Sequence, residues 1–285
     1  MSKQRLLQMV LLSIKQLRNP YYQGVAAQLA FYFLLSIVPA LIVLSQLMGF
    51  FSISLELLGE LIQDYVYEGA AEMLHGFIQS SSTGAMNVSF ILIALWSASK
   101  VQFSLIKIAN YTITDGQSTG GGYFKDRFKA MKTILFTLFT LTFALIILVY
   151  GEPILRLVLS TINRGMNVGI EVDALLLFLR WPTAMALYFM MVSYNYYALP
   201  NQKVKFKDIL PGSIFASVGM LLITYLYSIY ATYIANFDII YGSFATVVAL
   251  MFWFFFLSWA LVLGVLFNKV FHDTKPTVVV IIEDA

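Results

Sequence analysis

Cysteine is absent from this 285-residue sequence, and only 12% of its residues are charged. The lack of cysteine excludes disulfide scaffolds and cysteine-ligated metal sites. The two histidines, His75 and His272, lie far apart in the sequence, so we expect neither a metal site nor a cofactor. Hydrophobic residues make up 60% of the chain, whereas soluble domains are about 45–50% apolar and about 25% charged. A soluble fold with this composition would expose large apolar patches, so the composition indicates an integral membrane protein.

Six apolar runs are each long enough to cross about 30 Å of hydrocarbon as a helix of about 20 residues. They predict spans at residues 29–51, 88–109, 133–151, 181–199, 210–235 and 240–268. Apolar and polar residues do not alternate along these runs, as they do in the strands of a membrane barrel. The sequence therefore predicts one all-α, polytopic integral-membrane domain over residues 1–285, with six transmembrane helices.

Two amphipathic segments flank the first span. Residues 1–23 combine four basic residues with a short apolar stretch and no small-x-small cleavage site, which predicts an amino-terminal interfacial helix rather than a cleavable signal. Residues 54–80 predict an outer amphipathic helix with an acidic stripe that recurs every four positions: Glu56, Glu60, Asp64, Glu68 and Glu72. The stripe is either a rim that attracts cations over an external vestibule or a solvated helix face.

The distribution of Lys and Arg predicts the orientation. The amino-terminal segment and residues 110–132 hold four basic residues each, and residues 200–208 hold three. Beyond the opposite ends of the spans, only Arg156, Arg164 and Arg180 are basic. Both termini are therefore expected in the cytoplasm, which fits a multi-pass protein of the bacterial inner membrane. The basic segments are expected to contact anionic lipid headgroups at the inner face.

Lys100 is the one charge well inside a predicted span, about 18 Å from the start of that span at 1.5 Å per residue. A buried ammonium is costly and suggests a functional site, whose natural ligand is an anionic or phosphate-bearing molecule. The alternative is that Lys100 snorkels to the inner headgroups. The candidate residues for a substrate pathway are Lys100, Ser97, Ser99, Asn110, Tyr241 and Asn268.

Charges at the outer ends of the spans form a second group of candidates. Glu152, Arg156, Arg180 and Asp238 could pair across a closed outer gate. The alternative is that they anchor the helix ends at the membrane interface.

Two further groups of small residues stand out in the sequence. Gly212, Ser213, Ala216 and Ser217 have the spacing typical of helix contacts in lipid. The run 120–122 consists of three glycines that neither follow a strand nor precede Gly-Lys-Ser/Thr, so it is not a P-loop. We interpret this run as a flexible joint ahead of a basic segment.

Four motifs in order along the chain resemble the YihY/BrkB family of bacterial inner-membrane proteins. Residues 30–39 (AFYFLLSIVP) resemble the first span of that family, and residues 96–100 (WSASK), followed by Asn110, resemble its second-span motif. Residues 210–213 (LPGS) resemble the motif that opens its fifth span. Residues 240–243 (IYGS) resemble its last span, together with Trp253, Gly264 and Asn268. The resemblance covers nearly the whole chain and implies six spans with cytoplasmic termini.

The resemblance names a family without settling its chemistry. Members were once labelled ribonuclease BN, and some are linked to serum resistance or to envelope lipid export. The family pattern has an acid two residues after the glycine near the end of span six, and here Leu266 takes that place. If that acid couples protons in relatives, this chain either has lost it or carries it at another position.

Three functions follow from these observations. A transporter or lipid-handling protein for an amphiphilic anion or envelope lipid fits the six spans and Lys100. A non-catalytic membrane scaffold is the alternative. A ribonuclease would need a metal cluster or a histidine pair, and the predicted cytoplasmic acids, among them Asp126 and Asp208, are scattered. We therefore expect no enzyme activity and no nucleic-acid partner.

Overall fold

The computed structural model describes residues 3–50, 88–143, 172–233 and 242–274. Its helices are α1 (Lys3–Leu17), α2 (Pro20–Phe50), α5 (Val88–Ala98), α6 (Lys100–Ile113), α8 (Val172–Ala198), α9 (Phe206–Tyr233), the short 3-10 helix η1 (Gly242–Phe244) and α11 (Ala245–Asp273). Residues 123–143 are also helical. These four ranges contain no strand, which confirms the all-α prediction for them. Helices suit apolar runs in lipid because each helix pairs its own backbone groups.

Three stretches of the described chain have the length and hydropathy needed to cross a membrane: Leu92–Ile113, Phe206–Tyr230 and Val247–Asp273. They correspond to the second, fifth and sixth predicted spans, which supports a membrane protein. The other three predicted spans overlap α2, the helical segment 123–143 and α8. The count of six spans and the single domain stay predictions.

Several helices begin earlier than the predicted spans. α2 begins at Pro20 and α8 at Val172. Residues 123–132, which the sequence placed in a loop, are helical as well. Hydropathy detects only the part of a helix that crosses hydrocarbon, whereas the ladder of backbone hydrogen bonds continues into the polar interface.

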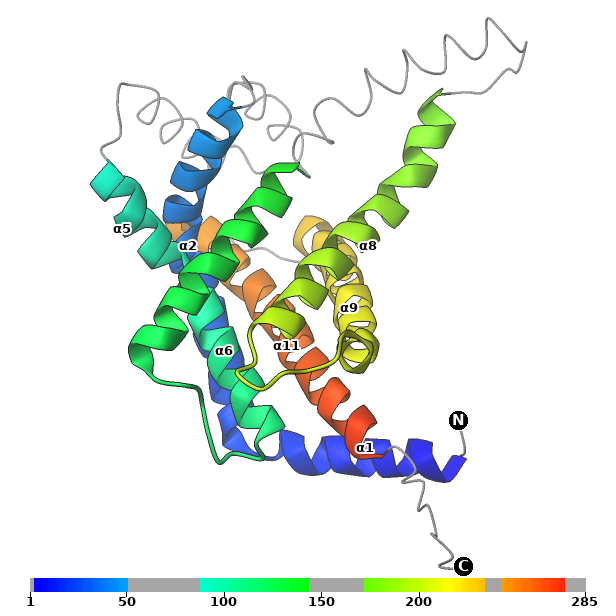
Figure 1. Ribbon diagram of the computed structural model, residues 1–285. Coiled ribbons are helices and arrows are strands. Elements are labelled where there is room, and N and C mark those ends of the chain that lie inside the picture. Colours follow the sequence, from blue (N-terminus) through cyan, green and yellow to red (C-terminus); the bar gives the residue numbers. More distant parts are fainter. Residues whose placement is uncertain (1–2, 51–87, 144–171, 234–241, 275–285) are drawn as a thin grey trace, which may run out of the picture.

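α1 lies across one end of the molecule, where the carboxyl end of α11 also lies (Figure 1). We call this end, with the loops 114–122 and 199–205, the α1 end. The Arg5 guanidinium donates a hydrogen bond of 3.1 Å to the Phe271 carbonyl and lies 4.6 Å from the centre of the Phe271 ring, which fastens α1 to α11. Five apolar side chains of α1 are exposed: Leu6, Leu7, Val10, Leu11 and Ile14. The position of α1 on a membrane surface stays a prediction.

α9 and α11 approach each other closely at two glycines, Gly212 and Gly264. A Cβ atom on Gly212 would collide with the Gly264 carbonyl oxygen and with the carboxamide of Asn268. The Gly212 N–H donates to Asn268 Oδ1 at 2.6 Å. From α8, the buried Tyr196 hydroxyl donates to the Leu261 carbonyl at 2.6 Å. α8, α9 and α11 are therefore joined by polar contacts as well as by apolar packing.

Small residues continue this contact along α9. Ser213, Ala216 and Ser217 are completely buried. Each serine hydroxyl donates to the carbonyl four residues earlier in its own helix, so it needs no partner on α11. The interpretation of these residues as a helix contact is confirmed.

Replacing Gly212 by alanine is expected to lower the free energy of unfolding by about 1–3 kcal/mol, because the added methyl group overpacks the contact with α11. Gly219 on the same helix is the matched control, since a Cβ there would lie 3.6 Å from the Ala260 Cβ, an ordinary contact. Thermal unfolding of both variants in detergent measures the difference. Equal midpoints for the two variants would contradict this assignment.

Candidate functional site

Polar side chains from three parts of the chain meet near the α1 end and form what we call the latch (Asn110, Asp126, Lys129 and Asn201). Asn110 Oδ1, on α6, accepts the Asn201 N–H at 2.8 Å. The Asn201 carboxamide donates to Asp126 Oδ1 at 3.2 Å. The Gly121 N–H donates to both Asp126 oxygens, at 3.1 and 3.0 Å. Asp126 is only 3% exposed, so these donors replace the hydrogen bonds to water that its carboxylate lacks.

Lys129 joins the latch to the carboxyl end of α8. Its ammonium donates to the Leu199 and Pro200 carbonyls at 2.8 and 2.7 Å, and to Asn201 Oδ1 at 3.1 Å. A helix end leaves carbonyls without partners, and a lysine is suited to bind them. Burial lowers the pKa of the Lys129 ammonium, and the nearby Asp126 carboxylate opposes that shift.

The glycine run 120–122 has a role that the sequence did not reveal. A Cβ atom on Gly120 would collide with the Asp126 carboxylate, and Gly122 has a φ of +113°, which side-chain-bearing residues rarely adopt. The run therefore has a packing role, and its flexibility stays a prediction. The glycines let the backbone approach Asp126 closely enough to donate hydrogen bonds.

A second arrangement, which we call the Arg127 cluster, consists of Trp96, Phe103, Lys107, Tyr123 and Arg127. The guanidinium carbon of Arg127 lies 4.3 Å from the Trp96 ring centre and 5.6 Å from the Phe103 ring centre. Lys107 Nζ lies 4.8 Å from the same Phe103 ring, which also contacts the Tyr123 ring at 5.6 Å. Two cations therefore share one aromatic ring, an arrangement that favours a nearby negative charge.

Arg127 is buried without a carboxylate partner in the described part of the chain. The residue is 3% exposed, its guanidinium donates to the Trp96 carbonyl, and its Nε finds no hydrogen-bond partner among the described residues. The ion pairs of the described ranges include those of Lys269 with Asp115 and Asp273. Such a buried, incompletely paired cation is costly, and its default interpretation is a ligand site.

The WSASK motif lies where α5 ends and α6 begins. The Ser99 hydroxyl donates a hydrogen bond of 2.8 Å to the Trp96 carbonyl, which also accepts a hydrogen bond from the Arg127 guanidinium. Lys100 is the first residue of α6. Lys100, Phe103 and Lys107 have the i, i+3, i+7 spacing of one helix face. Lys100 therefore lies on the same face of α6 as Phe103 and Lys107, two members of the Arg127 cluster.

Arg127 itself was missed by the sequence analysis, because residues 110–132 were assigned to a loop. One signal was available. Tyr123, Phe124 and Phe128 surround Arg127 in the sequence, and a run so rich in aromatic residues is typical of a helix at a membrane interface rather than of a solvated loop.

The other predicted pathway residues are placed as follows. Asn110 belongs to the latch, and its Nδ2 donates to the Ile106 carbonyl at 2.7 Å. Asn268 accepts the Gly212 N–H, and Ser99 binds the Trp96 carbonyl. Ser97 is partly exposed on α5, and Tyr241 lies outside the described residues. In this structure Asn110, Asn268 and Ser99 connect parts of the protein, and a role of any of these residues in a pathway stays a prediction.

The predicted outer features fall largely outside the described residues. This applies to Glu152, Arg156 and Asp238 of the gate and to the whole acidic stripe, Glu56, Glu60, Asp64, Glu68 and Glu72. Arg180 lies within α8, and its side chain is not described. The gate and the stripe stay predictions.

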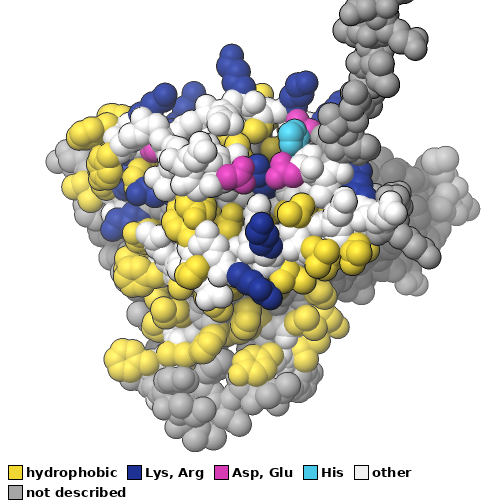
Figure 2. All heavy atoms as spheres, turned by 90° about the horizontal axis from the view of Figure 1, so that it is seen from below, with side chains coloured by type: hydrophobic (Ala, Val, Ile, Leu, Met, Phe, Trp, Pro, Cys, Tyr) yellow, Lys and Arg dark blue, Asp and Glu magenta, His cyan; other side chains and the backbone are white. Residues whose placement is uncertain are grey.

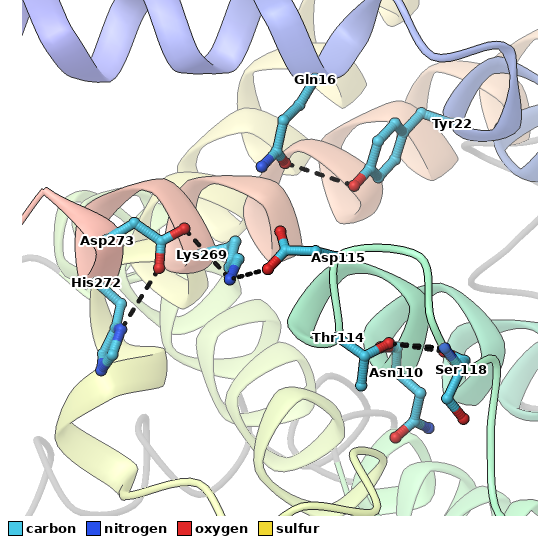
Figure 3. A network of polar contacts seen from close by, with 9 residues as sticks. All are labelled: Gln16, Tyr22, Asn110, Thr114, Asp115, Ser118, Lys269, His272 and Asp273. Carbon is cyan, nitrogen blue, oxygen red and sulfur yellow. Dashed lines mark hydrogen bonds and ion pairs between the residues drawn. The ribbon is translucent and has the colours of Figure 1, made fainter.

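An ion-pair network at the α1 end joins α11 to the turn after α6 (Figure 3). Lys269 Nζ lies 2.9 Å from Asp115 Oδ2 and 3.3 Å from Asp273 Oδ2. His272 Nδ1 lies 3.6 Å from Asp273 Oδ1. Figure 2 shows Lys and Arg side chains spread over this end, with hydrophobic side chains beside them. Within the described ranges, no group of three His, Cys, Asp or Glu side chains could hold a metal ion.

Comparisons with known proteins place the chain in a family. The family model described as virulence factor BrkB matches residues 13–278. A Bacillus subtilis protein named ribonuclease-like protein YfkH is 27% identical over 259 residues, 89% of this chain and 91% of its own. A UPF0761 membrane protein of Chlorobium phaeobacteroides is 28% identical over 264 residues, 88% of this chain and 54% of its own. No solved structure matches the chain. Because the family model covers nearly its whole length, the chain belongs to the virulence factor BrkB family, a family that includes UPF0761 membrane proteins.

Proposed function

We propose that this protein is a transporter or lipid-handling protein of the bacterial inner membrane, with both termini in the cytoplasm, and that it binds the anionic headgroup of an amphiphile at the Arg127 cluster. The observation that carries the proposal is the buried Arg127 guanidinium, which lies close to two aromatic rings and has no carboxylate partner in the described part of the chain.

The chemistry of the cluster favours a phosphate or carboxylate headgroup. A guanidinium presents a planar fork of N–H donors that matches these anions. The charges of Lys107 and Lys100 on the neighbouring face of α6 add to its attraction. Tyr123 of the cluster is strongly exposed, and so are Phe124 and Phe128, which flank Arg127 in the sequence. Aromatic rings of this kind suit the level of lipid headgroups, where an amphiphile has both polar and apolar parts.

The contacts of the acids favour this proposal over ribonuclease activity. Asp126 is bound by Gly121 and Asn201, and Asp115 and Asp273 are paired with Lys269. A phosphodiester-cleaving site needs carboxylates that are available to a metal or to water. The ribonuclease-like name belongs to the Bacillus subtilis relative. We propose that this chain is not an enzyme and does not bind nucleic acid.

Lipid retention by the Lys107→Ala variant tests the proposal. The protein is extracted directly into native lipid discs, and bound lipids are identified by mass spectrometry. We expect the wild type to enrich an anionic lipid over the bulk membrane. In Lys107→Ala this enrichment should fall by about fivefold, since one lysine near an anionic surface contributes about 1 kcal/mol.

Lys203→Ala is the matched control, because it removes the same charge from an exposed position in the loop 199–205. Its lipid enrichment should fall less than that of Lys107→Ala, because Lys203 lies outside the Arg127 cluster and contributes only a general surface charge. A bound pool that matches the bulk membrane in all three proteins would contradict lipid binding and would favour a scaffold. Lys100→Ala is measured in the same assay. Loss of the lipid enrichment would mark Lys100 as a contact of the bound lipid, whereas unchanged enrichment would mark it as a snorkelling side chain.

A further inference from the structure

Two buried amide oxygens in the helix interior have no hydrogen-bond partner among the described residues: Gln102 Oε1 and Asn195 Oδ1. The two residues are 2% and 6% exposed. Their NH₂ groups are paired, since Gln102 Nε2 donates to Thr137 Oγ1 at 3.1 Å and Asn195 Nδ2 donates to the Met191 carbonyl at 2.7 Å. Buried polar atoms are normally paired with protein or with ordered water. Each oxygen is therefore an acceptor that is suited to a donor from outside the chain.

The two oxygens belong to one group of three helices. Gln102 on α6 is hydrogen-bonded to Thr137 on the segment 123–143. That segment packs on α8, because the rings of Phe136 and Tyr194 stack at 3.8 Å between centres. Asn195 follows Tyr194 directly in α8. The buried Thr133 lies one turn from Thr137 on the same segment.

The latch holds all three helices together on the side of the α1 end. Asn110 lies two turns beyond Gln102 on α6, and the Leu199 carbonyl, which accepts Lys129, lies one turn beyond Asn195. Lys129 lies two turns before Thr137. On each helix, a residue that contributes to the latch thus lies one or two turns from the interior polar position, after it on α6 and α8 and before it on the segment 123–143.

We propose that a polar passage opens between α6, α8 and the segment 123–143 when the latch releases. In this passage the oxygens of Gln102 and Asn195 bind water or another neutral, hydrogen-bond-donating solute. Amide oxygens accept hydrogen bonds, so they select donors rather than anions. The passage is therefore a site of different chemistry from the Arg127 cluster, and it does not depend on lipid binding there.

Thiol labelling tests the passage directly, because the chain has no cysteine of its own. In protein reconstituted in lipid discs, Asn195→Cys is labelled with a small, water-soluble thiosulfonate, with and without Asn201→Ala. Asn201→Ala removes two hydrogen bonds of the latch from an exposed residue. We expect it to raise the labelling rate at least about tenfold, because local opening becomes more frequent.

Ser193→Cys is the control on the same helix. Ser193 is 3% exposed and lies about 160° around α8 from Asn195, given 100° per residue. Its labelling rate should stay unchanged when Asn201 is replaced. If Asn195→Cys does not fold, Thr137→Cys serves as the second probe. An unchanged rate at the probe position overturns the proposal, and so does an equal rise at Ser193→Cys, which would show general loosening.

Discussion

Replacing Arg127 by methionine is expected to reduce the retention of anionic lipid by about tenfold or more, while the fold remains at least as stable as the wild type. The retention falls because the variant lacks the guanidinium fork and its charge. The stability is maintained because burying a cation without a carboxylate is costly, and an apolar side chain of similar volume removes that cost. The Trp96 carbonyl keeps its hydrogen bond from Ser99.

Two measurements on the same preparation separate a binding role from a structural one. Lipid mass spectrometry in native discs gives retention, and thermal unfolding gives stability. Arg127→Lys is the conservative comparison, since it keeps the charge but lacks the planar fork, and its retention should be intermediate. A variant that unfolds early but retains the lipid would show that Arg127 serves the fold alone.

Replacing Asp126 by alanine is expected to lower the free energy of unfolding by about 3 kcal/mol. The Gly121 N–H and the Asn201 carboxamide lose a charged acceptor inside a largely buried network. Lys129 also loses the carboxylate that favours its charged form. Thermal or denaturant unfolding in detergent measures the change.

Asp273 provides the control for this prediction. Its carboxylate lies 3.3 Å from Lys269 Nζ but is partly exposed, at 35%. Exposed ion pairs contribute little, so Asp273→Ala should change stability by less than about 1 kcal/mol. A similar loss of unfolding free energy in both variants would mean that the latch contributes no more to stability than an exposed ion pair.

The membrane-spanning helices were predictable because hydrocarbon imposes a simple condition on sequence. A membrane-spanning run such as that of α11 has to be long and apolar. This condition depends on the local sequence alone and not on which other helices pack against the run. Helix ends were less predictable, as α8 shows by beginning at Val172 rather than near residue 181. The interface tolerates both helix and loop, so hydropathy does not distinguish them there.

The candidate site was predictable only in part. Lys100 was singled out because a charge in an apolar run is unusual in any structure. Arg127 was not, because its burial depends on Trp96 and Phe103, which come from other helices. Asn110 was noticed as a polar residue, but its partner Asn201 lies 91 positions further along the chain.

The sequence by itself determined that this protein belongs in a membrane and that its described part is built from helices, whereas the cytoplasmic side of its basic residues stays a prediction. These properties depend on local composition and on helix length. The tertiary structure alone decided that Gly212 meets Asn268, 56 positions away, and that Arg127 meets Trp96, 31 positions away. The free energy of such contacts depends on which helices pack together, and neither hydropathy nor charge along the chain contains that information.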